Sequence, residues 1–246
     1  MTFFWSGEKL SWLRYMTLYS FRKLNPDWVM ELHLSKPIHN LDKKWSTREV
    51  QDNFSSISKD SIDKIYDLDI NIIEHIPQRY CQHLFTELYR CLKTGGVVRF
   101  TNPDFDLGYQ AYKRKEIEFF NKYKGNDLDE KFLYFFASHH VVEKSESELE
   151  AIKKSLRTNF SSMSKEEFAD HYTLQIPEES QERHTESHIS WWNYEKMEYF
   201  LKTAGFKKIY LSKAQESKFP EMIGTGRNSG FDSTHPEFSM FVEAIK

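Results

Sequence analysis

Three side chains that could exchange a proton with a substrate lie beside predicted turns. His75 and Asp104 each stand close to a proline, and His188 precedes a predicted helix. Imidazole and carboxylate groups are common general bases of enzymes, because their pKa values can be brought near the working pH. We name these three residues as catalytic candidates. The simpler alternative for each is a hydrogen-bonded polar group of a turn or of the surface.

The histidines and cysteines do not show the spacing of a metal site. Among ten histidines only His139 and His140 are adjacent, and adjacent residues on a helix point apart. Cys81 and Cys91 lie ten positions apart in one predicted helix, too far for a disulfide or for a shared ion. The sequence therefore predicts no metal site and two reduced cysteines that serve in packing.

The composition is typical of a folded protein with little excess charge. The chain has 246 residues, of which 39% are hydrophobic and 16% aromatic, and its net charge is -3. This charge offers no basic field to nucleic acid or anionic lipid, so we expect neither partner. The first residues lack the pattern of a signal peptide, and no apolar run is long enough to span a membrane. We therefore expect a cytoplasmic protein, while its oligomeric state is left open.

Hydrophobic periodicity predicts strands that alternate with helices. A strand at 3–5, a helix at 10–24 and a strand at 29–34 form a βαβ opening, which a polar loop follows at 35–60. Later strands are predicted at 69–73, 97–101, 208–211 and 239–245, and helices at 78–94, 111–172 and 190–205, with Gly95 and Gly205 as left-handed helix ends. This order predicts an α/β fold, with one doubly wound and mostly parallel sheet, a helical lid inserted at 111–172 and an antiparallel terminal strand. We expect one domain over 1–246.

Several stretches resemble class I S-adenosylmethionine-dependent methyltransferases. The segments 73–77 (IEHIP), 88–96 (LYRCLKTGG) and 97–104 are similar to the fourth strand, the following helix and the fifth strand of that family. The segment 188–192 (HISWW) and the C-terminal residues are similar to small bacterial and phage members that often occur near polysaccharide genes. The resemblance covers 69–246. It implies a Rossmann-like fold, S-adenosylmethionine as cofactor and a role in polysaccharide biosynthesis.

The resemblance also implies where the cofactor would bind. An open α/β sheet holds its ligands in a crevice outside the carboxyl ends of its parallel strands. The cofactor-binding candidates are therefore Gly7, Asp69, Asn71 and Ile72, and Asn71 stands where relatives often carry a histidine close to the cofactor. The alternative is that Asn71 and the nearby His75 only cap or hydrogen-bond the turn before the next helix.

Two further residues are substrate-binding candidates for a saccharide or another small molecule. Asn102 closes the strand predicted at 97–101, at the carboxyl ends of the parallel strands, and Trp191 precedes a predicted helix. An aromatic face can stack on the apolar face of a sugar. Because adjacent side chains point in different directions, we expect Trp192 to pack with Met197 and Trp191 to face the ligand. The alternative is that both tryptophans belong to the core.

The first quarter of the chain departs from the methyltransferase pattern. That family holds its cofactor with a glycine-rich turn and with an acid after the second strand. Here Gly7 is the only glycine before Gly95, and the second strand is followed by Ser35, Lys36 and Pro37. Residues 1–60 instead resemble the start of capsule-type, sugar-nucleotide-dependent glycosyltransferases. This resemblance implies a gene fusion in which one βαβ opening replaced another.

Three functions follow from these observations. The first is a methyltransferase that acts on a sugar or another small polar acceptor. The second is a relative that has lost the cofactor and serves as a binding or structural module, as the absent glycine turn suggests. The third is a glycosyltransferase, which rests on the first quarter alone. Three Asp-x-Asp triplets would suit its metal, but such triplets arise readily among 37 acidic residues. They begin at Asp67, Asp104 and Asp127, outside the stretch with this resemblance.

Overall fold

A computed structural model describes nine parts of the chain: 2–5, 31–34, 47–49, 59–66, 73–174, 176, 184, 187–219 and 236–246. The helix predicted at 10–24 lies outside these residues. So do all four cofactor-binding candidates, Gly7, Asp69, Asn71 and Ile72. The chain divides into two compact units, Met1–Ser61 and Ile62–Lys246, and each is described by itself. The single domain expected over 1–246 stays a prediction.

The first unit contains a parallel sheet of three short strands. Strand β1 (Thr2–Trp5) pairs with β2 (Glu31–Leu34), and β2 pairs with β3 (Thr47–Glu49). The parallel pairing of β1 with β2 confirms the expected relation between the first two predicted strands. Strand β3 was missed because it lies within a polar segment, where alternation of apolar side chains gives little signal.

The second unit is built on a mixed sheet with the strand order β4-β5-β7-β6. Strand β4 (Ile62–Tyr66) runs parallel to β5 (Leu92–Pro103). Strand β7 (Ser239–Ile245) runs antiparallel to β5 and also to β6 (Lys208–Ser212). The α/β fold class and the antiparallel terminal strand are therefore confirmed.

Two local predictions in this unit were wrong. Ile73, the expected last residue of the strand predicted at 69–73, begins the short helix η1 (Ile73–His75), and residues 69–72 lie outside the described ranges. Strand β4 lies in an earlier apolar run, which was not predicted as a strand. Periodicity does not choose between two such short runs. Helix α2 (Gln78–Cys91) ends before the predicted glycine, and Gly95 lies within β5 with φ of 81°. The left-handed conformation was predicted correctly but assigned to the wrong element.

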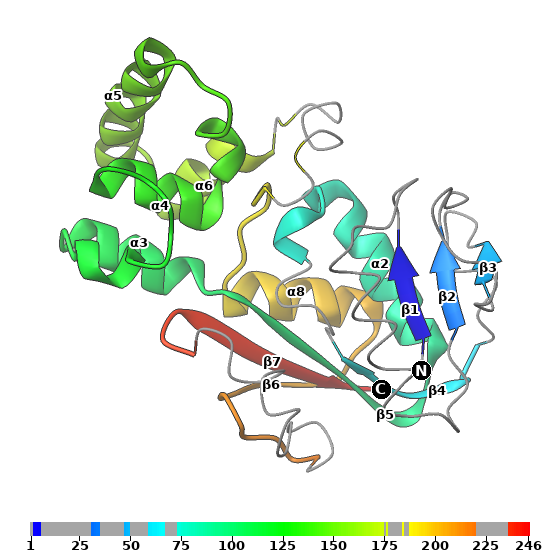
Figure 1. The fold of residues 1–246 in the computed structure, drawn as a ribbon. Helices are drawn as coiled ribbons and strands as arrows, with labels where there is room; N and C mark the ends of the chain where they lie inside the picture. The colour runs from blue at the N-terminus through cyan, green and yellow to red at the C-terminus, as the bar shows by residue number, and fades with distance from the viewer. Residues whose placement is uncertain are drawn as a thin grey trace. The chain divides into compact units, whose positions relative to one another are not determined.

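Helices α2 and α8 (Tyr194–Ala204) lie side by side on one face of the sheet (Figure 1). Alternate residues of β5 and β7 face these helices because side chains of a strand point to opposite faces in turn. Trp192 is 1% exposed and shares this core with Met197, as predicted. The shared core includes Cys81, Phe85, Leu88, Val98, Phe100, Leu201, Met240 and Val242. Gly205 ends α8 with φ of 114°, which confirms the predicted helix stop.

A helical insertion follows β5 and lies beyond its carboxyl end (Figure 1). It consists of α3 (Phe105–Lys113), η2 (Ile117–Phe120), α4 (Leu128–Phe136), η3 (Ser138–His140), α5 (Glu146–Ser162) and α6 (Lys165–Thr173). The helices enclose an aromatic core that includes Phe105, Phe120, Phe132, Phe135, Phe136 and Phe168. The insertion predicted at 111–172 is thus present and begins a few residues earlier. Within the described ranges, no helix is long and apolar enough to cross a membrane.

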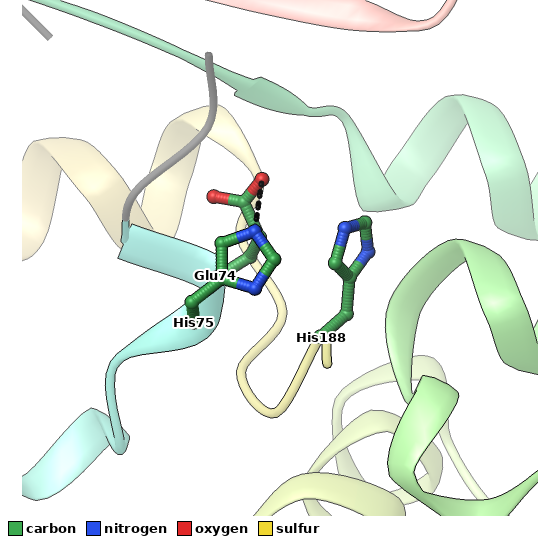
Figure 2. Close-up of side chains that lie close together, drawn as sticks. All are labelled: Glu74, His75 and His188. Carbon is green, nitrogen blue, oxygen red and sulfur yellow. Dashed lines mark ion pairs between the residues drawn. The ribbon is translucent and has the colours of Figure 1, made fainter. Parts of the chain in front are cut away.

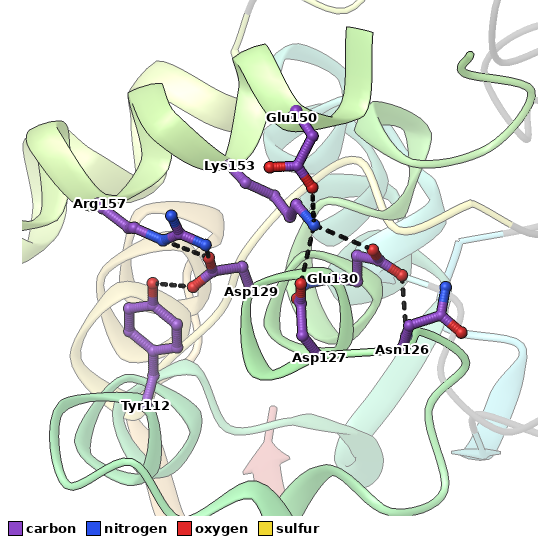
Figure 3. A network of polar contacts seen from close by, with 8 residues as sticks. All are labelled: Tyr112, Asn126, Asp127, Asp129, Glu130, Glu150, Lys153 and Arg157. Atoms are coloured by element: carbon purple, nitrogen blue, oxygen red, sulfur yellow. Dashed lines mark hydrogen bonds and ion pairs between the residues drawn. The ribbon is translucent and has the colours of Figure 1, made fainter. Parts of the chain in front are cut away.

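A polar network fastens α5 to the start of α4 (Figure 3). Lys153 is 5% exposed, and its Nζ lies 2.8 Å from Asp127 Oδ2 and 3.3 Å from Glu130 Oε1. Arg157, one turn further along α5, donates from Nε to Asp129 Oδ2 at 2.6 Å. The Asp127 side chain also caps α4 by accepting the backbone N–H of Glu130 at 3.0 Å. This Asp-x-Asp triplet therefore serves the fold.

Candidate functional site

Three segments that are distant in the sequence meet where the parallel strands β4 and β5 end. Helix η1 follows β4, and α3 follows β5. The segment before α8 lies against η1, because the backbone N–H groups of Ile189 and Ser190 donate to the Glu74 carbonyl oxygen at 2.7 and 3.0 Å. The backbone N–H of Phe105 donates to the Trp192 carbonyl oxygen at 2.9 Å. This is the edge at which open α/β sheets hold their ligands.

The side chains of Glu74, His75 and His188 lie together at this edge (Figure 2). The two imidazole centroids are 4.9 Å apart, and one potential ligand atom of each residue lies within 4.8 Å of the others. Glu74 Oε1 is 3.9 Å from His75 Nε2. The Glu74 side chain is 3% exposed, whereas that of His75 is 24% exposed. The structure thus brings together two of the three catalytic candidates.

Backbone carbonyl groups fix the orientation of both rings. His75 Nδ1 lies 2.9 Å from the Ser187 carbonyl oxygen, and His188 Nδ1 lies 2.6 Å from that of Phe135. A carbonyl oxygen only accepts hydrogen bonds, so each Nδ1 carries the proton and donates it. In a neutral ring of this tautomer, Nε2 carries the free lone pair. One ring nitrogen of His188 is turned toward the other two side chains in Figure 2.

His188 is neutral over the whole physiological range of pH. Burial and, to a smaller extent, the nearby His75 lower the pKa of His188 to about 3, although the hydrogen bond to Phe135 acts in the opposite direction. A proton is therefore absent from its Nε2 at neutral pH. This lone pair can accept a hydrogen bond or bind a cation.

Glu74 was not among the residues singled out from the sequence. The only hint in the sequence was its position beside His75. Glutamate side chains are usually exposed, so the residue type did not predict a buried carboxylate here. In the structure Glu74 is 2% exposed and borders a cavity of about 10 Å³, which Pro103, Ser190 and Trp191 also line. A volume of about 10–15 Å³ is room for one water molecule. Only tertiary packing makes this carboxylate a candidate.

Asp104, the third catalytic candidate, caps helix α3. Its Oδ1 accepts the backbone N–H of Asp106 at 3.0 Å, and its own backbone N–H donates to the Phe238 carbonyl oxygen at 2.9 Å. Burial raises the pKa of Asp104, and the hydrogen bond from Asp106 limits that rise. The simpler alternative, a polar group that serves a turn, accounts for this geometry.

Asn102 is completely buried near the end of β5. Its Nδ2 donates to the Pro103 carbonyl oxygen at 3.2 Å, whereas its Oδ1 has no hydrogen-bond partner among the described residues. A buried acceptor without a partner costs about 1–3 kcal/mol. A ligand hydroxyl or amine would satisfy it, so its role in substrate binding stays a prediction.

Trp191 is packed rather than open to a ligand. It is 5% exposed, and Lys196 Nζ lies 3.7 Å from the centre of its ring. The Phe105 ring centroid is 5.1 Å away, and the indole N–H donates to Asp170 Oδ1 at 2.7 Å. These contacts explain Trp191 as a core residue of the helical insertion. The sugar-stacking role expected from the sequence finds no support in this environment.

The described residues at the carboxyl edge of β4 and β5 do not by themselves line a cavity large enough for S-adenosylmethionine. The cavity beside Glu74 holds about 10 Å³, and a second one, lined by Gln78, Arg79 and Thr173 among others, holds about 50 Å³. Small-molecule sites usually occupy about 300–1,000 Å³. The orphaned Asn102 Oδ1 suits a ligand donor, but the residues expected to hold the cofactor lie outside the described ranges.

Comparisons with known proteins identify no family. No family model matches the sequence, and no match was found among curated proteins. An S-adenosylmethionine-dependent methyltransferase from Mesorhizobium loti aligns with a TM-score of 0.42 and 10% identity, covering 100% of this chain and 90% of that one. A methyltransferase from Methanosarcina mazei aligns with a TM-score of 0.41 and 11% identity, covering 100% of this chain and 92% of that one.

A third solved structure, a methyltransferase from Archaeoglobus fulgidus, aligns with a TM-score of 0.41 and 9% identity, covering 100% of this chain and 86% of that one. TM-scores and identities this low carry no inference about activity. The glycosyltransferase resemblance of residues 1–60 likewise stays a prediction.

Proposed function

We propose that the chain is an S-adenosylmethionine-dependent methyltransferase that acts on a hydroxyl group of a sugar or another small polar acceptor. One observation carries the proposal. His75 and His188, which the sequence had named as catalytic candidates, lie side by side with ring centroids 4.9 Å apart. They do so at the carboxyl edge of a parallel strand pair, where this class of fold binds its ligands. The resemblance of 69–246 supplies the reaction class.

The cluster offers chemistry that methyl transfer to a hydroxyl group can use. The acceptor oxygen must lie in line with the methyl group, and its proton must leave. Two Nε2 lone pairs and one carboxylate meet at the cluster, so a hydroxyl group placed there would find an acceptor for its proton. His75 is the more accessible histidine, and a positive charge on its ring would lie 3.9 Å from Glu74 Oε1.

A second function is favoured by a specific observation. Gly7 is the only glycine before Gly95, so the sequence lacks the glycine-rich turn that holds the cofactor in the methyltransferase family. This absence favours a methyltransferase relative that serves as a binding or structural module without a cofactor. No described residue favours the glycosyltransferase alternative in the same way.

Calorimetry and thermal unfolding with S-adenosylmethionine and S-adenosylhomocysteine test the proposal. A ligand that binds only the folded chain stabilises it by about 2.7 kcal/mol at 100 times its Kd. We expect measurable heat and a raised Tm with either compound. Absence of both at millimolar concentration would support the module instead. A shift that requires a sugar nucleotide and Mn²⁺ would support the glycosyltransferase.

Substitution of one histidine tests the part played by the cluster. Release of S-adenosylhomocysteine in the presence of a panel of sugars measures turnover. We expect His75→Gln to keep cofactor binding and to lose about 100-fold or more of this turnover, because the proton acceptor is gone. His83→Gln, at an exposed position of α2, is the matched control and keeps both properties.

A further inference from the structure

We propose that Glu74, His75 and His188 form a binding site for one divalent transition-metal ion of the Zn²⁺ class. One potential ligand atom from each residue lies within 4.8 Å of the other two. This inference goes beyond the methyltransferase proposal, and metal binding does not depend on that proposal. It also differs from the sequence-based expectation of no metal site, which considered only the spacing of histidines, cysteines and aspartates along the sequence.

The distances between the three potential ligand atoms are close to those around a bound zinc ion. Bonds of about 2.0–2.1 Å in a tetrahedron place neighbouring ligand atoms roughly 3.3 Å apart. The three potential ligand atoms lie up to 4.8 Å apart. To bind one ion, the side chains must therefore rotate so that each atom moves by about 1 Å. Rotations of this size lie within the broad terminal torsions of histidine and glutamate.

The hydrogen bonds behind the two rings are those that metal-binding histidines usually make. A histidine ligand commonly donates its other ring N–H to a carboxylate, a backbone carbonyl or a water molecule. Here Ser187 and Phe135 provide such carbonyl oxygens, at 2.9 Å from His75 Nδ1 and 2.6 Å from His188 Nδ1. Both rings are thereby held in the tautomer in which Nε2 carries no proton. Two independent elements, α4 and the segment before α8, supply these carbonyls.

The protonation state and the charge also suit a cation. A metal ion competes with protons for its ligands, and the two backbone carbonyl groups hold the ring protons of His75 and His188 on Nδ1, away from the cluster. The Glu74 side chain is 3% exposed. A carboxylate at such a position is costly to keep charged, and a dication would compensate its charge in a medium of low dielectric. Two imidazole nitrogens with one carboxylate favour Zn²⁺, Co²⁺ or Fe²⁺ over Mg²⁺ and Ca²⁺, which prefer oxygen ligands.

The arrangement leaves room for a further ligand. Three protein ligands are typical of catalytic zinc sites, which keep the fourth position for water or substrate. His75 is 24% exposed, so the cluster is open to solvent on its side, and the cavity of about 10 Å³ beside Glu74 can hold one water molecule. An ion lowers the pKa of an oxygen that it binds. If the methyltransferase proposal is correct, an acceptor hydroxyl group bound to the ion would lose its proton more readily than in water.

Metal binding is tested on the full chain after treatment with a chelator and removal of the chelator. Co²⁺ serves as the probe because its visible absorption reports the number and type of ligands, and Zn²⁺ is then titrated in competition. We expect one Co²⁺ per chain, an absorption spectrum typical of four or five ligands, and displacement by one equivalent of Zn²⁺. We also expect Zn²⁺ to raise the Tm, because the ion binds the folded state.

Variants separate this site from adventitious binding by the other histidines. We expect His75→Gln and Glu74→Gln each to weaken Co²⁺ binding by about 100-fold or more, while His83→Gln on the surface of α2 retains it. His75 is partly exposed, so its variant is expected to fold even if Glu74→Gln does not. The proposal is overturned if the chain binds no stoichiometric Co²⁺ at 50 μM, a concentration of the order used for spectroscopic titration, or if binding survives in both variants.

The two proposals fail in different ways. Co²⁺ binding is measured without S-adenosylmethionine, and cofactor binding is measured on the metal-free chain. A chain that binds Co²⁺ but neither S-adenosylmethionine nor its product retains the metal site and loses the methyltransferase assignment. A chain that binds the cofactor but not Co²⁺ retains the methyltransferase assignment and loses the metal site.

Discussion

Arg99 and Glu243 face each other across the antiparallel strands β5 and β7, and both side chains are buried. The guanidinium group donates to the Glu243 carboxylate and also to the Lys213 carbonyl oxygen, the latter at 2.8 Å. Tyr210, opposite Glu243 on β6, donates its hydroxyl group to the same carboxylate. A row of directly opposed polar side chains thus links three neighbouring strands. Such cross-strand pairs help to fix the register of a sheet.

Arg99→Met is expected to destabilise the fold strongly. It removes the cation and leaves the Glu243 carboxylate buried, at 0% exposure, without its charged partner. Breaking a buried ion pair in this way costs about 3–5 kcal/mol in the free energy of unfolding. Urea denaturation followed by circular dichroism measures the change. A loss of less than about 1 kcal/mol would show that Glu243 reaches water or another donor.

Two controls separate the buried pair from a general charge effect. The double variant Arg99→Met with Glu243→Met is expected to regain most of the stability, because two buried apolar side chains need no polar partners. Lys93→Met removes an exposed pair, in which Lys93 Nζ lies 3.0 Å from Asp63 Oδ2. Exposed pairs contribute about 0–1 kcal/mol, so this variant is expected to be nearly neutral.

Lys153→Met is expected to loosen the helical insertion by an intermediate amount. Lys153 is 5% exposed and pairs with carboxylates on α4 and α5, but the Asp127 side chain is 42% exposed. Water can therefore take over part of its role, and we expect a loss of about 1–2 kcal/mol, smaller than for Arg99→Met. Lys154→Met, at the exposed neighbouring position, is the matched control. Equal stability of both variants would show that the network does not stabilise the helical insertion.

Stability is expected to fall as the pH decreases from 6.5 toward 4. Burial lowers the pKa of His139 to about 3, of His140 to about 4 and of His188 to about 3. The unfolded chain binds protons at these positions below a pH of about 6.5, whereas the folded chain stays neutral until much lower pH. Because the unfolded state binds more protons in this range, lowering the pH shifts the equilibrium toward unfolding. Each histidine therefore contributes up to about 1.4 kcal/mol of lost stability per pH unit in this window.

The variant His140→Gln tests this pH dependence. Its amide can still donate to the Tyr172 carbonyl oxygen, which lies 3.0 Å from His140 Nε2 in the native chain, but it does not titrate. Urea denaturation at pH 7, 6 and 5 is expected to give a slope that is smaller by up to about 1.4 kcal/mol per pH unit. His83→Gln, with an exposed side chain, is expected to leave the slope unchanged. An unchanged slope for His140→Gln would contradict the buried neutral state of His140.

Gly205→Ala is expected to be more costly than Gly95→Ala. Both glycines have positive φ, 114° and 81°, where an alanine costs about 1 kcal/mol or more. A β-carbon at Gly205 would also lie 3.0 Å from Tyr89 Cε1, whereas one at Gly95 would have no atom within 4 Å. We therefore expect about 1 kcal/mol for Gly95→Ala and about 2 kcal/mol for Gly205→Ala in urea denaturation. Equal costs would mean that the Tyr89 ring moves aside freely.

Local patterns were enough to predict much of the second unit. The apolar repeat of α2 and α8 and the glycine that ends α8 follow from interactions between residues a few positions apart. The burial of Trp192 followed from the same reasoning. Where two short apolar runs competed, as before η1, the local signal was ambiguous, and strand β4 was not predicted.

The sequence by itself determined the α/β class, the helices that cover the sheet and the suggestion that His75 and His188 do chemistry. Only the tertiary structure decided that these histidines touch one another, that Glu74 is buried beside them and that Lys196 covers the ring of Trp191. The reason is physical. Helical and strand periodicity depend on neighbours along the chain, whereas burial and ring contacts depend on segments that the fold brings together from distant positions. The hydrogen bond from His188 to Phe135 on α4 is of this second kind.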